Sequence, residues 1–213
     1  EKQERRGVHH LVQGWIQQGQ ADKGLYLSKE VVKSSTGHSA VQAYYIATLL
    51  LSLHLGVSFE VYLPVEAAYY QKAFKAGTAF PYDDFGPFLG RALLWKMQLE
   101  LHADKKDVGP SISFATGRFS KGHLIIPELG AKLRYGPGSF VIFWSSRLLH
   151  TLGPRWQPTN DPIREAQGIT PGRAAHVFFF PLNSMKQLED KEEFWGVRTG
   201  YGRSLKSSYY GAV

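Results

Sequence analysis

The sequence predicts an α+β fold in which a helical N-terminal layer packs against a β core. Apolar residues in the first 92 positions recur mainly at helical spacing, and from residue 93 short β-type runs follow one another. Of the 213 residues, 43% are hydrophobic and 14% aromatic, so the chain can bury a sizeable core. We therefore expect a single domain with residues 1–92 as mainly helical support, 93–182 as the β core and 183–213 as a C-terminal extension.

The N-terminal part of the chain alternates helical patterns with one strand-like run. Apolar residues share one face of each expected helix, and glycines at 19, 56 and 77 mark where the helices should end. The loop that follows is punctuated by Pro and Gly and rich in aromatic residues. The expected elements are a helix at 8–15, a helix at 39–55, a strand at 57–63, a helix at 66–76 and a loop at 78–90.

The rest of the chain is dominated by short β-type runs. Gly and Pro separate them at the regular spacing that is typical of a barrel or a sandwich. No internal repeat or low-complexity tract interrupts this series. The expected strands lie at 95–101, 111–116, 123–126, 132–135, 140–144 and 176–181.

Composition excludes several kinds of chemistry. Because the chain has no cysteine, disulfides, thiolate nucleophiles and iron–sulfur clusters are excluded, and any metal must be held by His and carboxylate. Such ligands suit Fe(II), Mn(II) or Zn. The longest apolar run, at 47–55, is broken by Ser52 and His54 and is too short to cross a bilayer, so we expect no membrane contact. The chain starts at Glu1 without a signal-peptide pattern, and we interpret it as part of a longer protein.

The net charge is positive. With 25 Lys and Arg against 18 Asp and Glu, the formal charge is +7. This favours a polyanionic partner such as nucleic acid, and the alternative interpretation is a mildly basic soluble enzyme.

A pair of potential metal ligands stands at the end of one expected strand. His102 and Asp104 follow the run 95–101 at spacing H-x-D, and residues i and i+2 of an extended segment point to the same side. His150 ends the β-like run 139–149 and would complete a facial triad with open positions for substrate and dioxygen. The alternative is chance, because an H-x-D pair with a distant His arises often in a chain of this length.

The remaining histidines have ordinary interpretations. Adjacent His9 and His10 point to different faces and are interpreted as surface residues, and His54 as a capping or packing residue near a helix end. His123 and His176 stand beside or within expected strands and are interpreted as packing or exposed residues rather than ligands.

The segment between the ligands carries a family resemblance. Residues 121–124 (KGHL) stand where a "G-G-x-L" strand is typical, and residues 136–138 (GPG) supply an "x-P-G" turn before His150. This order resembles the double-stranded β-helix, or jelly-roll, core of 2-oxoglutarate-dependent dioxygenases. Residues 122–130 (GHLIIPELG), and 148–150 (LLH) followed by Gly-Pro, resemble more narrowly the TET/JBP branch, particularly its fungal members. The resemblance covers about residues 95–182.

The resemblance implies an activity. It implies Fe(II) held by His102, Asp104 and His150, 2-oxoglutarate as co-substrate, dioxygen as oxidant, and methylated DNA as substrate. The bases would be 5-methylcytosine, with N6-methyladenine as a second candidate, and the setting would be a monomer in the nucleus. Two alternatives stay open: an oxygenase of the same fold acting on a protein side chain, a lipid or a small molecule, and a non-catalytic β-barrel module that binds nucleic acid.

The far carboxylate of 2-oxoglutarate needs a cation, best a bidentate arginine on the last barrel strand. Arg173 opens the final β run and is the first choice. Its distance from His150 is longer than is usual in the superfamily, which we attribute to an insertion, and Ala175 replaces a common Ser. Arg155 and Arg164 are the rivals.

A base taken out of a DNA duplex needs aromatic faces and a basic rim. Tyr82, Phe85 and Trp144 are the aromatic candidates, with core packing as the alternative for each. Lys105 and Lys106 follow Asp104 directly and are candidates for phosphate contact, with solvated loop lysines as the alternative. The basic stretch 198–206 either tracks a phosphate backbone or is a plain surface tail.

Overall fold

The computed structural model describes residues 6–16, 24–32, 34–168 and 170–199. The fold is mixed α/β with antiparallel strand pairs, which confirms the expected class at this level. The chain divides into two compact units. The β unit comprises Glu1–His9 and Ala92–Val177, and the helical unit comprises His10–Arg91 and Phe178–Val213.

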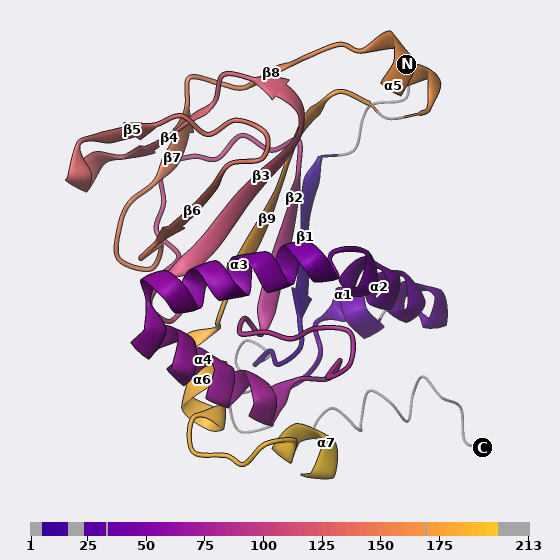
Figure 1. Ribbon diagram of the computed structural model, residues 1–213, viewed down its shortest axis with the longest axis vertical. Helices are drawn as coiled ribbons and strands as arrows, with labels where there is room; N and C mark the ends of the chain where they lie inside the picture. Colours follow the sequence, from indigo (N-terminus) through magenta and orange to yellow (C-terminus); the bar gives the residue numbers. More distant parts are fainter. Residues whose placement is uncertain (1–5, 17–23, 33, 169, 200–213) are drawn as a thin grey trace. The chain divides into compact units, whose positions relative to one another are not determined.

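The strands form two sheets (Figure 1). The larger has the order β1-β2-β9-β3-β6, with β8 paired to β3, and the smaller has the order β5-β4-β7. Their bounds are β1 Gly7–Val12, β2 Gly90–Trp95, β3 Ser111–Ser120, β4 His123–Ile126, β5 Ala131–Leu133, β6 Phe140–Phe143, β7 Thr151–Gly153, β8 Gln157–Pro158 and β9 Gly172–Phe179.

The core of the β unit lies between strands of both sheets. Alternate residues of β4 are buried, as expected for a strand with one face inward, and β3 buries Ile112, Ala115 and Phe119. Each large apolar side chain buried there contributes about 1.5–3 kcal/mol. The cluster contains residues of β3, β4, β6 and β7, together with Tyr135, which lies two residues after β5. Its buried members are Ala115, Phe119, Leu124, Ile126, Tyr135, Phe143 and Leu152.

A close backbone crossing fixes the start of β9. Gly117 on β3 has φ +105°, and a Cβ there would lie 2.2 Å from the carbonyl oxygen of Gly172. Gly172 has φ +145°, and a Cβ there would lie 2.6 Å from Cε of Lys96. The amide of Lys96 donates to the carbonyl of Arg173 at 2.8 Å. Only glycine fits both positions, so the crossing holds Arg173 in place.

The helical unit contains most of the helices. Ser34 caps α2 by accepting from the amide of Gly37 at 2.9 Å, and Pro64 occupies the first turn of α4. The helices of this unit are α1 Lys29–Val32, α2 Ser35–Ala47, α3 Leu49–Tyr62, α4 Pro64–Gly77, α6 Leu182–Leu188 and α7 Trp195–Thr199. The β unit adds the 3-10 helix η2 (Pro127–Leu129) and α5 (Pro162–Ala166).

Among the described residues no single helix is long and apolar enough to cross a bilayer, although α2 and α3 would qualify if joined. They are bent by 59° at the break between them.

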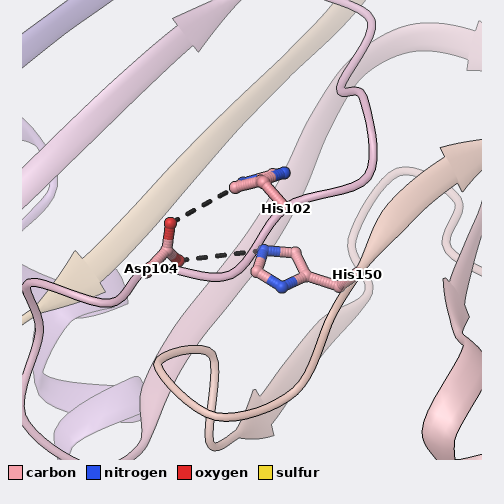
Figure 2. A group of neighbouring side chains, drawn as sticks. All are labelled: His102, Asp104 and His150. Atoms are coloured by element: carbon pink, nitrogen blue, oxygen red, sulfur yellow. Dashed lines mark ion pairs between the residues drawn. The ribbon is translucent and has the colours of Figure 1, made fainter.

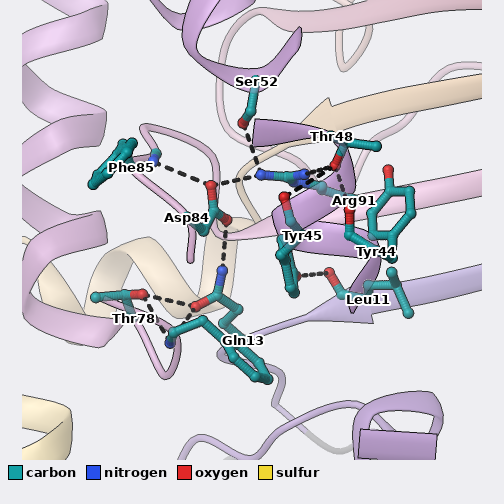
Figure 3. Close-up of polar contacts among 12 residues, drawn as sticks. Leu11, Gln13, Tyr44, Tyr45, Thr48, Ser52, Thr78, Asp84, Phe85 and Arg91 are labelled. Atoms are coloured by element: carbon teal, nitrogen blue, oxygen red, sulfur yellow. Dashed lines mark hydrogen bonds and ion pairs between the residues drawn. The ribbon is translucent and has the colours of Figure 1, made fainter. Parts of the chain in front are cut away.

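A buried ion pair anchors the helical unit (Figure 3). Arg91 and Asp84 are each 1% exposed, and their side chains meet at 2.5 Å. The other oxygen of Asp84 accepts from the side-chain amide of Gln13 at 2.7 Å, and Arg91 also donates to Ser52 at 2.7 Å. Since both charges are paired and hydrogen-bonded, they can be tolerated without water.

Two N-terminal predictions are wrong. Residues 8–15 were expected to be helical, but Gly7–Val12 is strand β1, because pairing with β2 outweighs a helical spacing that spans only two turns. Residues 57–63 were expected to be a strand, but α3 continues to Tyr62 through Gly56. Ser52, Leu55 and Phe59 of α3 are buried at helical spacing, so packing overrides the alternation. The expected helix 39–55 is divided at Thr48 between α2 and α3.

Most of the predicted β-type runs are confirmed. The runs 111–116, 123–126, 132–135, 140–144 and 176–181 match or overlap β3, β4, β5, β6 and β9, and the helix at 66–76 is confirmed by α4. The strand at 95–101 is wrong. Strand β2 ends at Trp95, where Lys96 takes φ +53°, a left-handed conformation that a regular strand cannot continue through.

Candidate metal centre

Three side chains converge within the β unit (Figure 2). Nε2 of His102 lies 3.6 Å from Oδ1 of Asp104, and Nε2 of His150 lies 3.7 Å from Oδ2 of the same carboxylate. One ligand atom from each residue lies within 4.8 Å of the other two. The two imidazole rings have centroids 4.3 Å apart. The structure therefore brings together the three residues that the sequence singled out.

Backbone bonds hold the two ligand-bearing segments together. His102 and His150 form an isolated antiparallel bridge, with N–O distances of 3.2 and 2.8 Å. The amide of Asp104 donates to the carbonyl of Ser145 at 2.8 Å. Farther along, the hydroxyl of Thr151 donates to the carbonyl of Leu99 at 2.7 Å. Side-chain bonds thus replace part of the strand ladder that the sequence predicted before His102.

The imidazoles are oriented by their own chain. Nδ1 of His102 lies 2.7 Å from the carbonyl of Glu100, and Nδ1 of His150 lies 3.0 Å from the carbonyl of Leu148. A carbonyl can only accept, so each Nδ1 carries the proton when the ring is neutral. Each Nε2 then directs its lone pair toward the space beside Asp104. This is the usual arrangement of metal-binding histidines.

Burial differs among the three residues. His150 is 6% exposed and packs edge-on against Phe143 at 4.9 Å, whereas the side chains of His102 and Asp104 are 39% and 30% exposed. Burial lowers the pKa of His150, while the Leu148 carbonyl and the charge of Asp104 oppose the shift. A lowered pKa keeps the ring neutral, which is the form that binds metal. Two neutral imidazoles and one carboxylate fit a divalent transition metal.

A buried guanidinium lies in the same unit. Arg173 on β9 is 1% exposed, and within the described part of the chain its Nε and Nη1 have no hydrogen-bond partner. The guanidinium lies 5.4 Å from the ring centre of Tyr135, whose hydroxyl is 2.6 Å from Oγ of Ser113. Burial lowers the pKa of Arg173, which Tyr135 opposes. A buried cation with two N–H donor atoms that lack hydrogen-bond partners is suited to bind an anion.

Arg155 and Arg164, the rival arginines, are exposed. Arg155 follows β7 in a loop, and Arg164 lies in α5. Of these three candidates Arg173 alone is buried, so it alone could hold a carboxylate away from water.

The expected substrate contacts lie in different units. Lys105 and Lys106 are exposed in the turn after Asp104, and Trp144 is half-buried directly after β6. Tyr82 and Phe85 are 89% and 50% exposed, so they are not core residues, but they belong to the helical unit. None of these positions by itself establishes a substrate contact.

The basic stretch 198–206 lies mostly outside the described residues. Of its members the structure describes Arg198 and Thr199. Arg198 pairs with Glu192 at 3.0 Å.

Sequence reasoning missed several polar residues near the candidate site. Tyr135, which lies beside Arg173, and Ser113, which is hydrogen-bonded to Tyr135, were not singled out, and nothing in the sequence distinguishes Ser113 from the other small polar residues of β3. Asp107, three residues after Asp104, was also missed. Burial, and then the charge of Asp104, raises the pKa of Asp107 to about 8.

The chain shares its fold with a protein of known structure. No protein-family model matches the sequence, and no curated protein matches it. A solved chain described as NgTET1 in complex with 5mC DNA is similar with a TM-score of 0.55 and 13% identity, covering 84% of this chain and 62% of that chain. A chain described as OsALKBH1 is similar with a TM-score of 0.34 and 23% identity, covering 43% of this chain and 49% of that one. The first similarity shows a shared fold, over less than two thirds of the other chain.

Proposed function

We propose that the chain is an Fe(II)- and 2-oxoglutarate-dependent dioxygenase that oxidises methylated bases in DNA. The observation that carries the proposal is the convergence of His102, Asp104 and His150 in the unit that also buries Arg173. The fold shared with NgTET1, whose structure is a complex with 5mC DNA, supports it. We further propose that the two sheets of the β unit form a double-stranded β-helix.

The metal would be held by three of the chain's own side chains. His102 and His150 would each present Nε2, and Asp104 would present a carboxylate oxygen between them. A set of three protein ligands would leave positions open for co-substrate and dioxygen. When bound, Fe(II) and 2-oxoglutarate supply oxidation of a C–H bond: dioxygen places one oxygen atom in the product alcohol and one in succinate, with release of carbon dioxide.

Arg173 would bind the far carboxylate of 2-oxoglutarate. Its Nε and Nη1 lack partners and can donate to an anion, and the planar guanidinium presents several N–H donors where lysine presents a single ammonium. The phenol of Tyr135 lies beside the guanidinium and shares a hydrogen bond with the hydroxyl of Ser113, so the phenol can donate to the carboxylate when Ser113 donates to it. An anion there would relieve the cost of burying the guanidinium, because the buried charge would gain a partner.

Charge is distributed unevenly between the units. The β unit contains fourteen Lys and Arg and eight Asp and Glu, whereas the helical unit contains eleven and ten. The excess positive charge therefore lies in the unit with the candidate metal centre, as expected if a polyanion binds there. Lys105 and Lys106 next to Asp104 would contact phosphates. Trp144, in the same unit as the candidate metal centre, is the proposed contact for a base removed from the duplex.

The direct test is turnover on defined DNA. Protein loaded with Fe(II) is incubated with 2-oxoglutarate, air and duplexes carrying 5-methylcytosine or N6-methyladenine, and succinate and oxidised bases are measured by mass spectrometry. Unmethylated duplex and the Asp104→Ala variant are the controls. Oxidised base in step with succinate supports the proposal. If succinate formed with a protein or small-molecule substrate but not with DNA, the enzyme would act on that other substrate. If the protein bound DNA but held no metal, it would be a non-catalytic binding module.

A further inference from the structure

Glu128 lies next to the candidate metal centre and is linked to it through a single peptide group. Its Oε1 accepts the amide hydrogen of Leu149 at an N–O distance of 3.0 Å. The carbonyl of the same peptide group belongs to Leu148 and accepts from Nδ1 of His150 at 3.0 Å. The three groups form a chain from carboxylate to peptide to imidazole.

The fold brings Glu128 to this peptide. Strand β4 pairs antiparallel with β7, with Ile125 opposite Thr151. The residues that follow β4 therefore lie close to those that precede β7, among them Leu149, whose amide Glu128 binds. Glu128 lies in η2, which begins at Pro127 directly after the buried Ile126. Its backbone is therefore fixed even though its side chain faces solvent.

We propose that Glu128 is a positioning residue for His150 and, through it, for the metal. This inference rests on the metal-binding role proposed above. By accepting from the Leu149 amide, Glu128 fixes the plane of the peptide and makes the Leu148 carbonyl a stronger acceptor, because hydrogen bonds in a chain polarise one another. A stronger bond to Nδ1 holds the ring in one orientation and increases the basicity of Nε2. His102 has the equivalent carbonyl contact, from Glu100, but no carboxylate is seen behind that peptide among the described contacts.

The role depends on an acceptor atom rather than on net charge. Glu128→Gln keeps an oxygen that can accept from the Leu149 amide, whereas Glu128→Ala removes it. A carboxylate that acted only through space would make the two variants behave alike. Glu60→Ala, an exposed glutamate of the helical unit, removes the same charge and serves as the control.

The experiment measures binding of Co(II) alone to the full chain by calorimetry and by its visible spectrum. We expect Glu128→Ala to raise the dissociation constant about tenfold, the lower end of the range for partners of metal ligands, because Glu128 is exposed. Glu128→Gln should stay within about threefold of the unchanged protein. NMR of the metal-free protein should show a slowly exchanging Nδ1 proton on His150 that is lost in Glu128→Ala and kept in Glu128→Gln.

Each outcome decides the proposal. Unchanged Co(II) affinity and an unchanged Nδ1 proton in Glu128→Ala would overturn it while leaving the metal centre intact. Equal losses in Glu128→Gln and Glu128→Ala would replace it with a through-space effect of charge. If the unchanged protein bound no metal, the proposed metal centre would be wrong, and the positioning role of Glu128 would be wrong as well. If Glu128→Ala failed to fold, the Gln variant and its Nδ1 proton would still decide between acceptor and charge.

Discussion

His102 and His150 bind each other through their backbones, because each amide donates to the other residue's carbonyl. The two candidate ligands therefore occupy directly opposed positions on neighbouring antiparallel segments. A slip of one residue between these segments would turn one imidazole away from Asp104, since side chains alternate along an extended chain. The register of the backbone thus determines whether the triad exists.

Replacing Asp104 by Ala should abolish metal binding. Asp104 is the group that faces both Nε2 atoms, so its loss should weaken Co(II) or Fe(II) binding by more than the roughly 10–100-fold that outer partners contribute. Calorimetric titration of the metal-free protein measures the effect. The control is His176→Ala, a histidine of the same unit that packs on Phe114. If the Asp104→Ala and His176→Ala variants bound the metal with equal affinity, the triad would not be the metal-binding site.

Arg173→Met should separate stability from co-substrate binding. Met has a similar volume and no unpaired donors, so we expect thermal stability to be unchanged or higher without 2-oxoglutarate. The Michaelis constant for 2-oxoglutarate should rise about 10–100-fold, because a charged hydrogen-bonding site is worth about 1.5–3 kcal/mol. Arg155→Met is the matched control. A large effect from Arg155 and none from Arg173 would reverse the assignment.

Charge reversal at Lys105 and Lys106 should weaken DNA binding selectively. If both lysines contact phosphates, the slope of log affinity against log salt should become shallower by about two in the K105E/K106E double variant. Turnover of 2-oxoglutarate without DNA should be unaffected. The control is K72E/K186E, which makes the same change in net charge at two exposed lysines of the helical unit. Similar salt slopes in both double variants would argue for a non-specific effect of charge.

Asp84→Ala should strongly destabilise the protein. The change leaves the Arg91 guanidinium buried without its anion, which costs about 3–5 kcal/mol for pairs of this kind. Urea unfolding followed by tryptophan fluorescence measures the loss. Asp83→Ala removes the neighbouring carboxylate, which is half-buried and bonds only Gln42 among the described side-chain contacts, so it should cost less than about 1 kcal/mol. A similar cost for both would mean that the buried pair is not stabilising.

The β core and the triad could be predicted because their signals are local. Short runs bounded by Gly and Pro matched β3, β4 and β6 closely, and the H-x-D spacing placed His102 and Asp104 on one side. The errors occurred where a short apolar pattern fits two periods. Val57, Phe59 and Val61 alternate as in a strand, yet Phe59 also lies four residues from the buried Leu55, and helix packing decided the outcome.

Contacts between residues that are far apart in the chain could not be predicted from the sequence. The pairing of Tyr135 with Ser113, and the approach of Tyr135 to Arg173, depend on which strands become neighbours. The left-handed turn at Lys96 could not be predicted either, because lysine carries no bias toward that conformation. It ends β2 at Trp95, the residue at which the expected strand 95–101 was to begin. The bridge of Glu128 to Leu149 likewise follows only from strand register.

The carbonyl contacts at both Nδ1 atoms have a consequence for the rate of metal capture. Both rings are already restricted to one face by Glu100 and Leu148 before any ion arrives. Rotational freedom of the two imidazoles is thus lost when the chain folds, not when it meets the metal. Capture should then proceed without a slow rearrangement step, and its rate should increase in proportion to metal concentration until water loss from the ion becomes limiting.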